Sequence, residues 1–374
     1  MKIAMIGQKE VPSRVGGIEV AVEALAVRMA AQGHKVTLYN CSRYSLRKKE
    51  KRTKYKQYKG VIIREVKVPN VKGISAALGS ALGTFRAVFG KYDCIHYHAE
   101  GSAVMSFVPH LLGIRTVVTI HGLDWQRSKW GTFAAWYLKL GEKISVACAD
   151  EIIVLSRATQ KYFQENYFRS TVMIPNGIEQ PVERSVNMIE KKWKLEKNGY
   201  ILFVGRIVPE KGIENLIRAF QRISTKKKLV IAGGISDTKR FYKKLKKIAW
   251  TDPRIVFTDF VQDEVLAELY SNCYFYCLPS ELEGMPISLL EAMSYGNCCL
   301  CADIPECVEV VGERGILFKK GDAEDLEAHL RILCEKPELV VESRRRMSGF
   351  VFEENNWDKI TEETLALYRS KSTE

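Results

Sequence analysis

The chain has 374 residues, of which 46% are hydrophobic and 27% charged. This length suits two domains with separate cores, and the composition excludes an intrinsically disordered chain. The formal net charge of +13 is uneven, because residues 1–180 carry 27 lysines and arginines against 13 acidic residues, whereas residues 181–374 carry 30 against 31.

Short apolar strands alternate with helices in the first half of the chain. The clearest helix, residues 18–32, repeats Ala, Val and Leu at helical spacing and ends at Gly33. Strands are predicted at residues 2–6, 35–39, 61–66, 94–97, 116–120 and 151–155. Such alternation predicts a parallel sheet joined by right-handed crossovers.

The alternation begins again after a polar stretch at residues 178–198, where we expect the linker between two domains. Strands are predicted at residues 200–204, 228–232, 255–257, 274–278 and 298–301, and helices at 212–223, 238–248, 263–270 and 286–295. We therefore predict an α/β fold with two doubly wound parallel-sheet domains, residues 1–178 and 179–356, followed by a final helix from residue 357.

Half of the ten cysteines lie in apolar, strand-like runs without nearby histidines. Reduced cysteine behaves there as a small hydrophobe, so free thiols are favoured over a zinc site. The chain opens with a short strand rather than a signal peptide, and no stretch is long and apolar enough to span a bilayer. We expect a cytoplasmic protein.

Gly16 and Gly17 stand directly before the helix predicted at residues 18–32. Glycine permits a close approach, and the first amides of a helix lack internal partners, so this position suits a phosphate or a sugar. A tight turn that needs a positive φ is the alternative. The spacing is not the Gly-x-Gly-x-x-Gly fingerprint, which disfavours a dinucleotide oxidoreductase.

Three histidines lie on neighbouring predicted strands. His121 ends one strand and is followed by glycine, so we expect its imidazole over a cleft rather than in a core. His96 and His98 alternate along another strand and share one face of the sheet. His98 is a candidate for the acceptor side, with a packing role as the alternative.

Asp124 and Arg127 follow His121 and stand among the aromatic residues Trp125 and Trp130. This patch suits either a sugar acceptor or a membrane surface. A denser basic run covers residues 43–59 and predicts an anionic partner, either the inner leaflet of a membrane or nucleic acid. A solvated loop is the alternative interpretation of this run.

In the second half, Gly205 and Arg206 follow the strand predicted at residues 200–204, and Lys211 stands five positions later. The glycine lets backbone approach a ligand, and the two cations supply the charge that a diphosphate requires. The carboxyl end of a strand is also where open parallel sheets bind ligands.

A second turn connects the strand predicted at residues 274–278 to the helix predicted at 286–295. Glu283 lies in this turn, Pro286 is predicted at the first helical position, and Glu291 lies inside the helix. The helix N-terminus suits an anion, whereas a carboxylate suits the hydroxyl groups of a sugar. Two ordinary surface acids are the alternative interpretation.

These motifs together resemble the retaining glycosyltransferases of family 4, which have the GT-B fold of two facing Rossmann-like domains. The likeness extends over nearly the whole chain. It implies an active site between the domains, donor binding by residues 179–356, acceptor binding by residues 1–178, and a C-terminal helix, residues 357–374, that packs back on the first domain.

The resemblance also implies roles for single residues. Catalytic roles fall on Glu283 and His121, which contact the transferred sugar, and on Arg206 and Lys211, which neutralise the diphosphate. Implied donor-binding residues are Gly16, Gly17, Gly205, Gly284, Met285, Pro286, Ile287 and Glu291, the last of which holds the ribose. By helical rise Glu291 is about 12 Å from Glu283, too far for a double-displacement pair.

The implied reaction is transfer from a nucleoside-diphosphate sugar to a hydroxyl of a glycan or lipid-linked glycan, without a metal or other cofactor. The turns at Gly16 and His121 look most like bacterial enzymes of surface polysaccharide synthesis, including rhamnosyl- and hexosyltransferases. A nucleotide-sugar epimerase of the same architecture and a basic nucleic-acid-binding protein are the alternatives. No nucleic-acid reader motif is present, so nucleic acid is not the expected partner.

Overall fold

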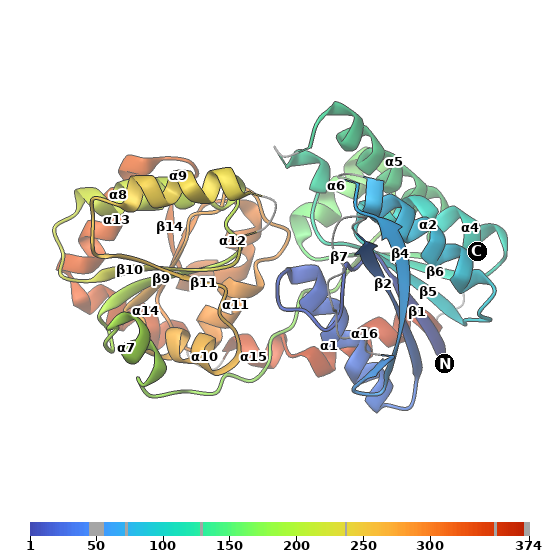
Figure 1. Ribbon diagram of the computed structural model, residues 1–374, viewed down its shortest axis with the longest axis horizontal. Coiled ribbons are helices and arrows are strands. Elements are labelled where there is room, and N and C mark those ends of the chain that lie inside the picture. Colours follow the sequence, from blue (N-terminus) through green and yellow to red (C-terminus); the bar gives the residue numbers. More distant parts are fainter. Residues whose placement is uncertain (45–55, 72–73, 128–129, 236–237, 348–349, 370–374) are drawn as a thin grey trace. The chain divides into compact units, whose positions relative to one another are not determined.

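The computed structural model describes residues 1–44, 56–71, 74–127, 130–235, 238–347 and 350–369. The chain divides into two compact units, residues 1–177 together with 357–374, and residues 178–356. Each unit is an α/β structure built on its own largely parallel sheet (Figure 1). Most of the basic run at residues 43–59 lies outside the described residues.

The sheet of unit 1 has eight strands in the order β3-β4-β2-β1-β5-β6-β7-β8, and only the short β3 is antiparallel to its neighbour. The strands are β1 (Lys2–Ile6), β2 (Lys35–Tyr44), β3 (Gln57–Tyr58), β4 (Val61–Pro69), β5 (Cys94–His98), β6 (Arg115–Ile120), β7 (Glu151–Val154) and β8 (Val172–Met173). The α-helices are α1 (Gly17–Ala31), α2 (Ile74–Val88), α3 (Glu100–Ala103), α4 (Phe107–Leu111), α5 (Thr132–Cys148), α6 (Arg157–Tyr167) and α16 (Trp357–Arg369). Short 3-10 turns are η1 (Val104–Ser106) and η2 (Asp124–Gln126).

Helices cover both faces of this sheet, so its central strands are buried on both sides. One core cluster includes Leu25 of α1 and Trp357 of α16, and the other includes Ala87 of α2 and Phe163 of α6. The C-terminal helix α16 packs against α1 (Figure 1), where Arg28 Nε donates to Asp358 at 2.7 Å. The last described turn of the chain is therefore part of the core of unit 1.

The sheet of unit 2 has six parallel strands in the order β11-β10-β9-β12-β13-β14. They are β9 (Tyr200–Val204), β10 (Lys228–Ala232), β11 (Ile255–Asp259), β12 (Phe275–Leu278), β13 (Cys299–Ala302) and β14 (Ile316–Phe318). The α-helices are α7 (Met188–Trp193), α8 (Ile213–Arg222), α9 (Lys239–Ala249), α10 (Asp263–Asn272), α11 (Ile287–Ser294), α12 (Pro305–Val311), α13 (Ala323–Glu335), α14 (Pro337–Met347) and α15 (Phe350–Glu354). The 3-10 turns are η3 (Pro209–Lys211) and η4 (Gly312–Arg314).

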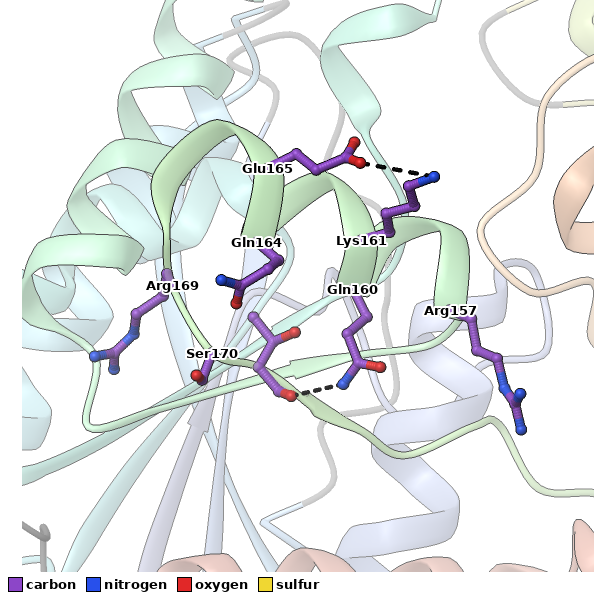
Figure 2. A pocket seen from close by; sticks show the side chains of 8 residues that line it. Arg157, Gln160, Lys161, Gln164, Glu165, Arg169 and Ser170 are labelled. Carbon is purple, nitrogen blue, oxygen red and sulfur yellow. Dashed lines mark hydrogen bonds and ion pairs between the residues drawn. The ribbon is translucent and has the colours of Figure 1, made fainter.

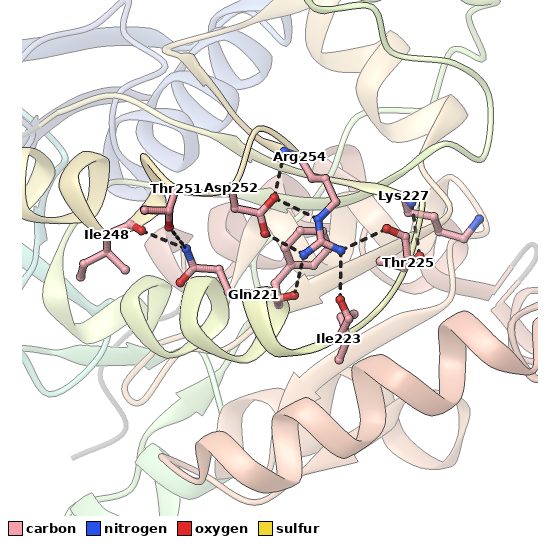
Figure 3. A network of polar contacts seen from close by, with 9 residues as sticks. Gln221, Ile223, Thr225, Lys227, Ile248, Thr251, Asp252 and Arg254 are labelled. Atoms are coloured by element: carbon pink, nitrogen blue, oxygen red, sulfur yellow. Dashed lines mark hydrogen bonds and ion pairs between the residues drawn. The ribbon is translucent and has the colours of Figure 1, made fainter.

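One core cluster fills unit 2, and a polar network closes it at the amino ends of β10 and β11. Figure 3 shows the Arg254 guanidinium in a two-point ion pair with Asp252, at 2.9 and 2.7 Å. The same guanidinium donates to the backbone carbonyls of Ile223 and Thr225, both at 3.0 Å, which joins the end of α8 to the start of β11. Hydrogen bonding to Arg254 lowers the pKa of Asp252.

The predicted strands and helices of both halves are present, with ends that shift by a few residues. The segment 178–198, which we expected to act as a linker, instead belongs to unit 2: it contains α7, and the amides of Met188 and Ile189 donate to Glu268 at 3.0 and 2.9 Å. The helices α2 and α5 were among those not predicted, because neither has clear start and stop signals in the sequence.

Candidate active site

Strands β9 and β12 form the topological switch point of the sheet in unit 2. From β9 the chain proceeds to β10 and β11 on one side, and from β12 it proceeds to β13 and β14 on the other. Loops at the carboxyl ends of such a strand pair diverge and leave a crevice, where ligands bind in open parallel sheets. The two motifs predicted to bind a donor occupy these two loops.

Glycines allow the two loops to approach closely. Gly212 has a φ of +65°, and a Cβ atom there would lie 1.9 Å from the carbonyl oxygen of Pro279. In the loop after the neighbouring strand β10, a Cβ atom on Gly233 would lie 1.7 Å from the carbonyl oxygen of Gly205. Between the loops, the amide of Glu281 donates to the carbonyl of Glu210 at 2.9 Å. Larger residues at Gly212 and Gly233 would push these backbones apart.

This approach brings Lys211 and Glu283 into an ion pair. The side chains are 11% and 9% exposed, so both charges lie in a largely dehydrated position. Arg206 lies in the same loop as Lys211, is partly exposed, and forms no ion pair with the described residues. The switch point therefore has one paired cation and one cation available to an incoming anion.

The turn after Glu283 leads into α11, which begins at Ile287. Pro286 precedes the helix with a φ of −77° and a ψ of 98°, so the prediction that it occupies the first helical position is wrong. Its extended ψ starts the helix one residue later, and as the N-cap residue Pro286 has no side-chain acceptor for the first amides of α11. Gly284 and Met285 lie in the turn between Glu283 and this helix.

Glu291 is held by a tyrosine that we did not predict. The Tyr270 hydroxyl lies 3.0 Å from Glu291 Oε2 and 3.2 Å from the carbonyl of Ser288. Because α11 begins only at Ile287, the separation of about 12 Å expected from helical rise does not apply between Glu283 and Glu291. The two carboxylates have different partners, Lys211 and Tyr270.

Two other polar residues of this edge lacked a sequence signal. The Ser280 hydroxyl is fully buried beside Pro279 and has no hydrogen-bond partner among the described residues. Glu306 follows β13, and burial raises its pKa, with Glu283 acting in the same direction. A lone serine or glutamate after a strand is common, so only the fold distinguishes them.

In unit 1 the switch point lies between β1 and β5. Gly7 ends β1 with a φ of +124°, and a Cβ atom there would lie 2.1 Å from the carbonyl oxygen of His98. The glycine pair lies nearby in sequence: Gly16 is the N-cap of α1 with an extended φ of −138°, and Gly17 is its first residue. Neither has a positive φ, so the alternative of a tight turn is wrong.

Three histidines form a column across β5 and β6. His98 Nδ1 lies 3.1 Å from His121 Nε2, and the rings of His96 and His98 stack with centroids 4.0 Å apart. His96 lies 2.5 Å from the hydroxyl of Tyr368 in α16 and 2.7 Å from that of Thr119. Burial lowers the pKa of His121 to about 4 and that of His96 to about 3, and it also lowers the pKa of His98 well below its ordinary value. All three imidazoles are therefore neutral at physiological pH.

His98 is completely buried, which corrects its expected place on the acceptor side. It lies behind His121, which is partly exposed, and beside a cavity of about 20 Å³ lined also by Asn176 and Trp357. Such a cavity holds one water molecule at most. His98 therefore contacts His121 and supports its orientation.

The patch after His121 has a rigid support. Asp124 at the start of η2 and Arg127 directly after it form an ion pair at 2.6 Å, and the indole of Trp125 donates to Glu142 of α5 at 3.1 Å. Glu142 also accepts from the hydroxyls of two α6 tyrosines, Tyr162 and Tyr167. Burial, together with the charges of Asp124 and Glu142, raises the pKa of the nearby Glu100 to about 10.

A separate groove of about 420 Å³ lies along α6 and the loop that follows it (Figure 2). Its polar side chains make local contacts: Gln160 donates to the carbonyl of Thr171 at 2.8 Å, and Lys161 pairs with Glu165 at 3.6 Å. Arg169 donates to the carbonyl of Ala149 at 2.6 Å. These contacts stabilise α6 and its return to β8.

The predicted site residues thus form two groups, one in each unit. Gly205, Arg206, Lys211 and Glu283, with the start of α11, meet at the switch point of unit 2, where cations and free amides suit a diphosphate and a carboxylate suits a sugar. His121 and the Asp124–Arg127 pair lie at the carboxyl end of β6 in unit 1. Among the described residues, no cluster of three or more His, Cys, Asp or Glu suits a metal ion.

Comparison with known families gives a match for each half of the chain. Residues 186–350 match the family described as glycosyl transferases group 1, and residues 15–180 match Glycosyltransferase Family 4. An uncharacterized glycosyltransferase of Methanocaldococcus jannaschii is 26% identical over 99% of this chain and 98% of its own length. A capsular polysaccharide biosynthesis glycosyltransferase of Staphylococcus aureus is 27% identical over 62% of this chain and 63% of its own length.

A solved structure has the same fold. HepE of Anabaena, crystallised with UDP and glucose, superposes with a TM-score of 0.80 and 18% identity, over 98% of this chain and 99% of that one. The expectation of the GT-B fold is therefore confirmed. No helix within the described residues has the length and hydrophobicity needed to span a membrane.

Proposed function

Because this chain belongs to the group 1 and family 4 glycosyltransferases, we propose that it transfers a sugar from a nucleoside-diphosphate sugar to a hydroxyl of a glycan or lipid-linked glycan. The observation that carries the proposal is the meeting of Lys211, Glu283 and Arg206 at the switch point of unit 2. The matches to glycosyltransferases do not favour an epimerase or a nucleic-acid-binding protein.

In the proposed donor complex, the diphosphate lies against Arg206, Lys211 and the first amides of α11. Negative charge grows on the diphosphate as the sugar leaves, and cations fixed in a dehydrated site stabilise that charge in the transition state. Glu283 accepts hydrogen bonds from the sugar, and Glu291, held by Tyr270, does so from the ribose. Gly205, Gly284, Met285, Pro286 and Ile287 provide backbone close to the donor.

We assign the remaining positions to unit 1. His121, neutral and oriented by His98, donates or accepts a hydrogen bond with the transferred sugar. Gly16 and Gly17, at the start of α1, approach the donor phosphate. Asp124 and Arg127 contact the acceptor.

Retention of configuration is part of the proposal. A double displacement needs a carboxylate placed to attack the anomeric carbon, and Glu283 is already paired with Lys211. Front-face attack requires no such nucleophile, because an oxygen of the leaving phosphate takes the proton of the acceptor hydroxyl. No metal or other cofactor is required in this scheme, because Lys211 and Arg206 supply the positive charge.

The capsular and UDP-bound relatives support the substrate class. The Staphylococcus aureus relative is named for capsular polysaccharide biosynthesis, and HepE was crystallised with UDP and glucose. We accordingly propose a role in surface polysaccharide synthesis with a hexosyl or deoxyhexosyl donor. A cytoplasmic enzyme of this kind meets a lipid-linked acceptor as a peripheral protein at the inner face of the membrane.

The test is a thermal-shift panel with UDP, dTDP, GDP, ADP, NAD and a short DNA duplex, for wild type and Arg206→Ala. A ligand at about 100 times its Kd stabilises the folded state by about 2.7 kcal/mol. We expect a shift with one or more nucleoside diphosphates that Arg206→Ala weakens. A shift with NAD or DNA alone would refute the donor site.

A further inference from the structure

Helix α2 of unit 1 exposes its large apolar residues to solvent and buries its small residues, the reverse of the usual arrangement in a globular protein. Its buried face consists of small residues, Ser75, Gly79, Ser80, Gly83, Thr84 and Ala87. Its exposed face carries Ile74, Leu78, Leu82 and Phe85, and Phe89 continues the same line one turn later. These five residues, which we call the α2 stripe, follow one another at spacings of three and four positions and so share one side of the helix.

Close packing explains the small residues. A Cβ atom on Gly79 would lie 2.6 Å from Cys41 Sγ, and one on Gly83 would lie 3.5 Å from Tyr39 Cβ, both on β2. The helix therefore lies too near the sheet for large side chains on its inner face. Packing within the described part of unit 1 does not explain the outer face, because a helix held by small residues requires no apolar residues toward solvent.

The exposed apolar surface of the α2 stripe is substantial. Phe85 is 56% exposed, Phe89 83% and Ile74 53%. The neighbouring helix α4, which contacts α2 (Figure 1), adds Leu111 at 77%, with Leu112 directly after it. Contiguous apolar patches of this kind mark surfaces that meet another apolar phase.

The charges around the stripe show which partner fits. Between residues 74 and 112 the lysines, arginines and acids are Arg86, Lys91, Asp93 and Glu100, and Glu100 is fully buried. Arg86 and Lys91 are both exposed and stand next to Phe85 and near Phe89. The whole segment 1–180 has a large cationic excess as well. Asp93 is exposed as well, so the local balance is two exposed cations against one exposed acid. Together with the excess over residues 1–180, this balance favours an anionic bilayer over a second, equally cationic copy of the chain.

We propose that the α2 stripe, with Leu111 and Leu112, is the surface by which unit 1 docks on an anionic lipid bilayer. An apolar helix face bordered by cations lies in the membrane interface, with its side chains among the acyl chains and its charges at the headgroups. This inference deepens the proposed function. It rests on that function only in assuming that the acceptor is lipid-linked. Docking here brings the enzyme to the surface where such an acceptor is found.

The experiment is co-sedimentation with phosphatidylcholine vesicles, with and without phosphatidylglycerol, using wild type and Phe85→Ser/Phe89→Ser. The matched control is Phe168→Ser/Trp250→Ser, which removes two aromatic residues that are 86% and 87% exposed elsewhere on the molecule. We expect wild type and control to bind the anionic vesicles, and the α2 variant to bind about tenfold more weakly or less. Unchanged melting temperatures verify that all three proteins are folded.

Three results would overturn the proposal. They are no binding of wild type to anionic vesicles, equal binding of the α2 variant, and a wild-type dimer without vesicle binding that the α2 variant converts to a monomer. The last result would mean that the α2 stripe is the interface with a second copy of the chain. The nucleoside-diphosphate shift is measured on the same proteins, so loss of vesicle binding with an intact shift separates this proposal from the proposed function.

Discussion

Lys211 and Glu283 lie 72 positions apart in the sequence and form an ion pair at the switch point of the second sheet. The pair couples the two loops that carry the candidate donor site. A diphosphate bound at Lys211 would share this cation with Glu283, so the ammonium joins the phosphate to the carboxylate that we assign to the sugar. In the proposed donor complex, the pair would therefore set the distance between the diphosphate and the sugar.

Removal of either member should affect turnover more than folding. We expect Lys211→Ala and Glu283→Gln each to lower kcat/KM by about 10²-fold or more, because each removes charge that acts on the transition state. The control is Lys319→Ala, which removes the lysine of an exposed pair with Asp322 in the same unit. Steady-state kinetics with the donor found in the thermal-shift panel tests this, and near-normal turnover of Lys211→Ala would exclude its role at the phosphate.

Tyr270→Phe should weaken donor binding by releasing Glu291. The hydroxyl contributes about 0.5–1.5 kcal/mol, so the Kd for the nucleoside diphosphate should rise about 2- to 12-fold. Tyr276→Phe is the matched control, since it removes another buried hydroxyl, 2.9 Å from Ser288 Oγ, without touching Glu291. Calorimetric titration compares the two variants. Equal affinities for the nucleoside diphosphate would contradict the proposed contact between Glu291 and the ribose.

The buried histidine column predicts acid sensitivity. The folded-state pKa of His121 is about 4 and that of His96 about 3, below the ordinary value of 6.5, so the unfolded chain binds more protons between these values. Stability should therefore fall as pH is lowered from about 6.5 toward 4, by up to about 1.4 kcal/mol per pH unit for each histidine. Urea unfolding across this range measures it. His98→Gln should reduce the slope, whereas the exposed His110→Gln should not, and parallel slopes for both would contradict the prediction.

The Arg254 network predicts a stability effect away from the site. Arg254→Lys keeps the charge but loses the two-point contact with Asp252 and leaves backbone carbonyls without a donor (Figure 3). We expect a loss of about 1–3 kcal/mol in the free energy of unfolding. Arg218→Lys, at an exposed pair with Glu214, should cost less than about 0.5 kcal/mol. Denaturant titration at neutral pH distinguishes the two, and equal losses would mean that the network contributes little.

Local patterns were enough to predict the class of fold. Strand periodicity, turn glycines and helix ends are properties of short segments, so the alternation of strands and helices can be predicted from the sequence. The same holds for the candidate donor motifs, because Arg206, Lys211 and Glu283 each follow a predicted strand. Helix α2 was not predicted although its apolar residues repeat at helical spacing, because Gly79 and Gly83 interrupt the segment and its ends lack clear signals.

Contacts between segments that are distant in the sequence could be identified only from the folded structure. That Lys211 pairs with Glu283, that Tyr270 holds Glu291, and that His98 is buried behind His121 all depend on strand order and on backbone approaches such as that of Gly212 to Pro279. No single segment encodes these distances. The sequence alone identified the groups that we propose bind a nucleotide sugar, whereas the packing of one loop on another determined which of them meet.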